Sequence, residues 1–103
     1  MTDKNQDLIL ETQLYREDEL RQLVLDGVTT RTILCAVSRP TRTEWASAAR
    51  SGLKASRCVT VWADEYEGET VAILDGVRYS VYRTYEPNID EVELYLEQVA
   101  GVT

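Results

Sequence analysis

Carboxylates gather in the run ADEYEGE, in a pattern that could do chemistry. Asp64, Glu65, Glu67 and Glu69 lie close together there. Paired carboxylates act as the acid and base of glycosidases or hold Mg²⁺. The run also joins two segments rich in β-branched residues, where a turn with solvated charges is the usual outcome. We therefore interpret it as a turn.

The composition argues against the common kinds of catalytic site. The 103-residue sequence has no histidine, which removes the usual general base and a frequent metal ligand. Its two cysteines, Cys35 and Cys58, are too few for a zinc site and lie in apolar runs typical of buried free thiols. No glycine-rich phosphate loop is present. The sequence predicts a protein that is not an enzyme, without catalytic, metal-binding or cofactor-binding residues.

The stretch DGVRYSVYRTYEPNIDEVELYLE (75–97) holds four tyrosines and many carboxylates. Tyrosines can stack nucleic-acid bases, but the carboxylates would repel a phosphate backbone, so core or interface packing is favoured. Alternation places Arg83 on one strand face with Val81 and Tyr85. A buried arginine needs a carboxylate, and Glu93 or Glu97 on a neighbouring strand is the expected structural partner. A contact with another subunit is the alternative.

The carboxylates, the tyrosines and Arg83 are positioned by predicted strands. Alternating and β-branched patterns predict strands over residues 7–15, 23–37, 58–66, 70–74 and 77–85. Residues 16–22 suit a helical turn or the tip of a long hairpin. Residues 91–99 fit both a strand and a helical stripe, and the strand is favoured. Asp75-Gly76 predicts a hairpin turn.

The expected architecture is mainly β, a small antiparallel β-barrel or sandwich of about six strands. One short helix or long loop is expected near residues 41–52, where Thr41 or Thr43 can cap its start and Gly52 its end. The length predicts a single domain, 1–103. Its ends, residues 1–6 and 100–103, are expected to be flexible. The polar start and the lack of a long apolar run predict neither a secretory signal nor a membrane span.

Charge is distributed unevenly along the chain, which has a net charge of −7. Residues 1–30 carry seven acids and three bases, residues 31–57 one acid and six bases, and residues 58–103 ten acids and two bases. The middle of the chain is a basic island between acidic flanks. In an assembly such opposite surfaces can meet across a subunit boundary.

The order of several motifs is similar to that in a known family. They are SRPTRTEWASAARSGLKAS, then VTVWADEYEGETVAILDGVRYSVYRTY, then DEVELYLE. Over residues 29–97 the chain resembles the head closure (head–tail adaptor, or stopper) proteins of long-tailed double-stranded DNA phages. The resemblance implies a small β-barrel-like subunit that forms a ring under the portal and adaptor rings. Such a ring closes the DNA exit after packaging and gives the tail its docking surface.

The resemblance also implies partners and a location. The partners would be further copies of the chain, the portal or adaptor protein and tail proteins, with no membrane. The location would be the virion neck, after assembly in the host bacterial cytoplasm. The loop implicated in closing the channel corresponds to residues 40–57, which carry much of the basic island. The candidates for channel or subunit contacts are Arg42, Glu44, Trp45, Arg50, Lys54 and Arg57.

The basic candidates, Arg42, Arg50, Lys54 and Arg57, are expected to touch either a neighbour's carboxylates or, transiently, the packaged DNA. Overall acidity weakens the DNA option. Two other functions stay open: a tail completion protein of the same neck, and a small acidic inhibitor that mimics DNA. The concentrated basic island speaks against the inhibitor.

Overall fold

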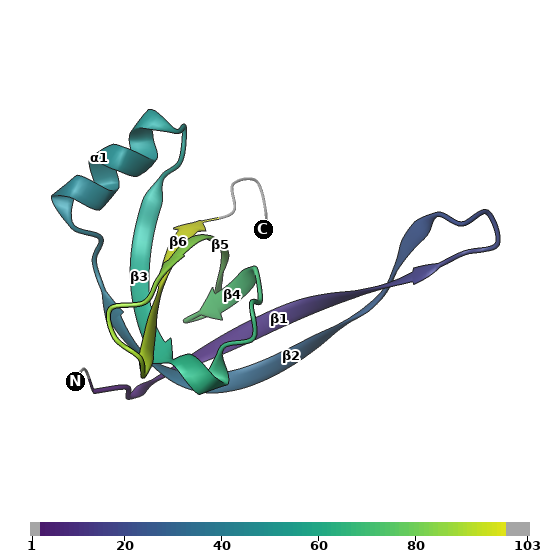
Figure 1. Cartoon of the computed structure of the whole chain (residues 1–103), viewed down its shortest axis with the longest axis horizontal. Coiled ribbons are helices and arrows are strands. Elements are labelled where there is room, and N and C mark those ends of the chain that lie inside the picture. Colours follow the sequence, from purple (N-terminus) through teal and green to yellow (C-terminus); the bar gives the residue numbers. More distant parts are fainter. Residues whose placement is uncertain (1–2, 99–103) are drawn as a thin grey trace.

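The computed structural model describes residues 3–98, which form six strands, one α-helix and one turn of 3₁₀ helix (Figure 1). The strands are β1 (Gln6–Glu17), β2 (Leu23–Ser38), β3 (Ala55–Trp62), β4 (Val71–Leu74), β5 (Val77–Tyr85) and β6 (Glu91–Gln98). The α-helix is α1 (Arg42–Arg50), and the 3₁₀ turn is η1 (Ala63–Glu65). The mainly β prediction with one short helix is confirmed. The expected flexible C-terminus lies outside the described residues.

All strand pairs are antiparallel, and the sheet closes in the order β1-β2-β3-β6-β5-β4. The closing seam between β1 and β4 is short, with three residue pairs from Ile9–Ile73 to Glu11–Val71. Asp75 and Gly76 both have positive φ angles, 51° and 77°, in the predicted turn between β4 and β5. Residues 91–98 form a strand, so the alternating interpretation is confirmed.

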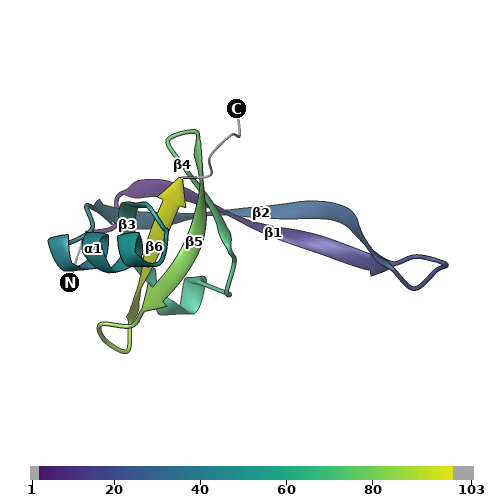
Figure 2. The same cartoon turned by 90° about the horizontal axis from the view of Figure 1, so that it is seen from above.

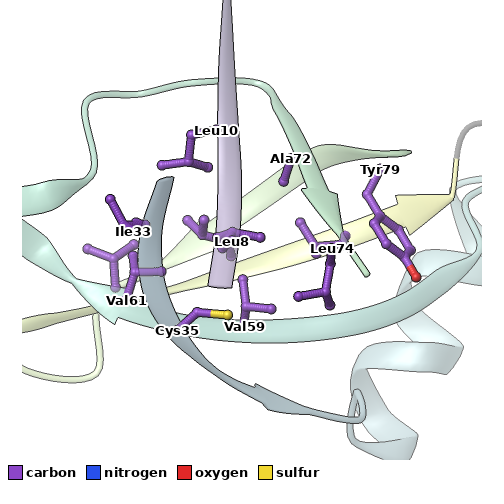
Figure 3. Packing of buried hydrophobic residues seen from close by; sticks show 12 residues of the cluster. Leu8, Leu10, Ile33, Cys35, Val59, Val61, Ala72, Leu74 and Tyr79 are labelled. Atoms are coloured by element: carbon purple, nitrogen blue, oxygen red, sulfur yellow. The ribbon is translucent and has the colours of Figure 1, made fainter. Parts of the chain in front are cut away.

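Alternate residues of the strands point into the barrel and fill it (Figure 3). Leu8, Leu10, Val59, Leu94 and Leu96 are fully buried there. Val59 and Val61 face inward as the period-two pattern predicts, while Cys58 and Trp62 belong to the other parity. The core therefore comes from the barrel segments of the strands.

The hairpin of β1 and β2 is much longer than the barrel. Beyond Glu11, β1 has no second neighbour because β4 ends its pairing there, and residues 12–17 pair with β2 alone. Figures 1 and 2 show this extension leaving the barrel as a two-stranded arm, which we define as residues 12–29. The molecule consequently measures 48 × 31 × 26 Å. The long-hairpin interpretation of residues 16–22 is correct.

A substitution pair separates the barrel core from the arm. Leu94→Ala removes a fully buried side chain and should lower the free energy of unfolding by about 2–5 kcal/mol, because it leaves a cavity. Leu20→Ala, at the arm tip where Leu20 is 77% exposed, should change it by less than about 0.5 kcal/mol. Urea unfolding measures both. Equal losses would contradict the assignment of Leu20 to solvent.

Candidate interaction surfaces

One face of the arm is apolar and open to solvent. Register pairs Tyr15 with Leu25, and the flanking pairs Gln13–Val28 and Glu17–Leu23 lie on the same face. Four residues of this face form what we call the arm patch: Tyr15, Leu23, Leu25 and Val28. Their exposed fractions run from 50% to 75%. Solvent-exposed apolar side chains gathered in this way mark interaction sites.

A β-bulge creates this patch. The register of β1 with β2 shifts between Leu14 and Tyr15, so that Asp26 has no partner across the ladder. Asp26 instead accepts a hydrogen bond from Arg16 at 3.1 Å. Because of the extra residue, Leu25 and Val28 fall on one face despite their odd spacing. No simple alternation reveals the patch in the sequence, and the sequence-based interpretation missed it.

The arm tip is an ordered turn. The Asp18 carboxylate accepts hydrogen bonds from the backbone N–H groups of Leu20 and Gln22, both at 2.9 Å. Arg21 takes a positive φ of 61°. Residues 17–22 hold three acids and one base, so the tip is acidic beside the apolar arm patch.

The segment of residues 40–57, which we call the basic segment, forms α1 and the link to β3. The Thr41 hydroxyl accepts a hydrogen bond from the Glu44 N–H at 3.1 Å, which caps the helix start as predicted. Gly52 follows the helix with φ +77°, and its N–H donates to the Ala49 carbonyl. The side chains of Arg42, Arg50, Lys54 and Arg57 are exposed.

Glu44 differs from the other candidates in this segment because it is buried and anchors α1 to the barrel. Its carboxylate pairs with Arg83 of β5 and accepts a hydrogen bond from the Tyr82 hydroxyl at 2.7 Å. Burial alone would raise the pKa of Glu44, but these hydrogen bonds outweigh it and hold the pKa below its ordinary value. Glu44 is thus engaged within the chain.

The predicted partners of Arg83 were wrong. Arg83 pairs with Glu44, whereas Glu93 accepts a hydrogen bond from the Tyr95 hydroxyl and Glu97 one from the Lys54 N–H. The cause is a bulge at Tyr82, between the pairs Val81–Leu96 and Arg83–Tyr95. It reverses the parity of the strand and turns Arg83 outward.

Once turned outward, Arg83 lies over the Tyr95 ring, 4.1 Å from its centroid, and under α1. A groove of about 420 Å³ opens beside this contact, between the helix and the barrel. Its lining includes Thr43, Ser47 and the Glu44–Arg83 pair. The groove is small and polar, and the ion pair that lines it is already satisfied.

The acidic run 64–69 is an ordered connection between β3 and β4, so the strand predicted over residues 58–66 ends earlier, at Trp62, and the run is not solvated throughout. Glu69 is buried and accepts a 3.0 Å hydrogen bond from the Arg31 Nε. Burial alone would raise the pKa of Glu69, but hydrogen bonds from the Arg31 guanidinium and nearby backbone N–H groups outweigh it and hold the pKa below its ordinary value. Within residues 3–98, no group of three or more acids and cysteines is placed to hold a metal ion.

Both cysteines are free and buried, as predicted. Burial raises the pKa of the Cys35 thiol to about 11 and also raises that of Cys58. Thiols of this kind are poor nucleophiles at neutral pH because little thiolate forms. No helix in the part of the chain that the structure describes is long and apolar enough to cross a membrane.

A second surface hollow lies on the barrel, with a volume of about 650 Å³. Its apolar lining comes from Leu34, Trp62, Ala63 and Ile89, and its acidic rim from Asp64, Glu65 and Asp90. Trp62 is covered by Lys4, whose ammonium lies 3.6 Å from the ring centroid and pairs with Glu91. The described part of the N-terminal segment is thereby attached to the barrel.

Comparison with known proteins adds no assignment. No protein-family model matches the chain, and no curated protein matches it significantly. The surfaces described above must therefore support any functional proposal by their chemistry.

Substituting Glu44 tests its anchoring role. At pH 7, Glu44→Gln should lower the free energy of unfolding by about 1–3 kcal/mol, because Arg83 loses its charged partner. A carboxyl with a lowered folded-state pKa stabilises above its unfolded pKa and loses that contribution as pH falls through the folded value. The difference in free energy of unfolding between wild type and Glu44→Gln should therefore shrink towards pH 3.

Urea unfolding at pH 7 and pH 3 measures this change. Glu86→Gln, in the exposed β5–β6 loop, is the matched control and should differ little from wild type at either pH. A Glu44→Gln deficit that is equally large at both pH values would contradict the role of the ionised carboxylate.

Proposed function

We propose that this chain is a structural protein of a phage neck, of the head closure type. It would assemble as a ring under the portal and adaptor, close the DNA exit channel after packaging and present a docking surface to the tail. The resemblance of residues 29–97 to that family supports the assignment to the neck. The six-stranded barrel agrees with the fold that the resemblance implies.

One observation carries the ring-forming part of the proposal: two unlike surfaces lie at opposite ends of the molecule. The arm tip is at one end of the long axis and α1 at the other, in both views (Figures 1 and 2). A ring of identical subunits needs a heterologous interface, in which one patch of each copy meets a different patch of the next. A chain with an exposed apolar patch on the arm and an exposed basic helix at the other end meets this requirement.

The basic segment is the part that the proposal places at a subunit or channel contact. Among the described residues, no ion pair engages the exposed side chains of Arg42, Arg50, Lys54 and Arg57. These cations can therefore meet an acidic surface or phosphates without first breaking an internal pair. Trp45 is 59% exposed on the same helix and supplies apolar contact area.

Replacing all four basic residues with alanine tests the function. The variant should bind a purified portal–adaptor complex of the same phage at least about tenfold more weakly, because several charge contacts are lost. Co-sedimentation measures binding, and nuclease protection of packaged DNA measures closure. The triple variant Arg42→Lys, Arg50→Lys and Arg57→Lys keeps the charges and should retain most binding.

Three outcomes would contradict the proposal in different ways. Unchanged binding and DNA retention would remove the basic segment from both roles. Binding to isolated tail ends but not to the portal–adaptor complex would indicate a tail completion protein. A soluble complex with a basic DNA-binding protein, and no binding to neck components, would indicate the acidic inhibitor.

A further inference from the structure

We infer that the arm of one copy docks on the outward face of α1 of the next copy, so that the chain associates head to tail. The inference deepens the proposed ring and rests on it for its biological setting. The contact itself is argued from the arm patch and α1. Neither surface is covered within the described chain.

The outward face of α1 carries an aromatic ring beside a positive charge. Arg42, Trp45 and Ala49 are spaced i, i+3 and i+7, which places them on one helix face. Arg50 lies at the end of the helix, beyond the Arg42 edge of this face. Glu44 and Ala48 lie on the side of the helix that is buried. We call Arg42, Trp45, Ala49 and Arg50 the helix patch.

The arm matches the helix patch in both polarity and charge. The arm patch offers tyrosine, leucine and valine side chains as apolar contact area for Trp45, and aromatic residues such as Tyr15 and Trp45 are enriched in interface cores. Beside it, the exposed acids Glu17 and Glu19 at the arm tip can meet Arg42 and Arg50. Aromatic and arginine anchors of this kind provide most of the binding energy in protein interfaces.

The other apolar hollow on the barrel is a poorer partner for the arm. Its lining includes the exposed Leu34 and Ile89, but its rim is acidic, with Asp64, Glu65 and Asp90. An acidic arm tip would meet like charges there, which disfavours docking. Charge therefore selects the helix patch over the hollow.

The position of the two patches determines the kind of assembly. They lie at opposite ends of the chain (Figure 2), and one copy cannot bring its own arm to its own α1 while the barrel is closed. Contact between different copies leaves one free arm at one end and one free helix patch at the other end of every linear oligomer. Growth then continues until a ring closes.

Two variants that each lose one patch test this arrangement. Variant A carries Leu23→Asp and Leu25→Asp, and variant B carries Trp45→Asp and Arg50→Glu; all four positions are exposed. Sedimentation equilibrium should show wild type self-associating and each variant alone associating at least about tenfold more weakly. An equimolar mixture should form a 1:1 dimer that grows no further, because B keeps an arm and A keeps a helix patch.

Control measurements keep the test decisive. Circular dichroism and urea unfolding should show that A and B stay folded. Ile89→Asp, at an equally exposed apolar site in the hollow, should leave self-association unchanged. A wild type that stays monomeric at its solubility limit, an A–B mixture without dimer, or loss of association in Ile89→Asp alone would each overturn the inference.

The arm contact and the proposed neck function can fail independently. Binding of wild type to the portal–adaptor complex together with a failed A–B mixture would reject the arm contact and leave the neck assignment standing. A 1:1 A–B dimer together with no binding of wild type to the portal–adaptor complex would support the arm contact and reject the neck assignment.

Discussion

Closure of the barrel through β1 is the constraint on which the rest of the structure depends. The seam between β1 and β4 has three residue pairs, and two contacts extend it: a fork of hydrogen bonds from Arg78 to Glu11, and the Gln6–Asp75 hydrogen bond at 2.9 Å. Without this seam the inward side chains would share no enclosed core. The same strand then continues beyond the seam, so barrel closure also sets the base and direction of the arm.

Buried carboxylates recur wherever a further segment is attached to the barrel. Glu44 attaches α1 through Arg83, Glu69 attaches the η1–β4 connection through Arg31, and Glu91 attaches the N-terminal segment through Lys4. Each carboxylate is buried, so loss of its cation would leave a buried charge without its partner. Some of the acids in this chain, whose net charge is −7, thus form buried ion pairs that hold segments to the barrel. Exposed acids remain at the arm tip and around the barrel, at Asp64, Glu67, Asp75, Glu86 and Asp90, whereas the basic segment exposes mainly cations.

The strands, the Asp75-Gly76 turn and the α1 caps were predictable because each depends on local alternation or on single residues with special backbone preferences. The partner of Arg83 was not, since a bulge at Tyr82 reverses strand parity and the packing of α1 is a tertiary effect. The arm patch was hidden for the same reason: the bulge at Asp26 disrupts the alternation that would reveal it. The exposed basic residues were found from charge counting alone, because long cationic side chains without partners stay in water.

In the arrangement that we propose, identical copies join arm to helix in a ring of the phage neck. Cryo-electron microscopy of the assembled neck, with this chain traced in the density, tests it most directly. We expect a closed ring under the portal and adaptor in which each Leu25 packs near Trp45 of the adjacent copy. A neck without the chain, or a ring whose arms lie away from every neighbouring α1, would contradict it.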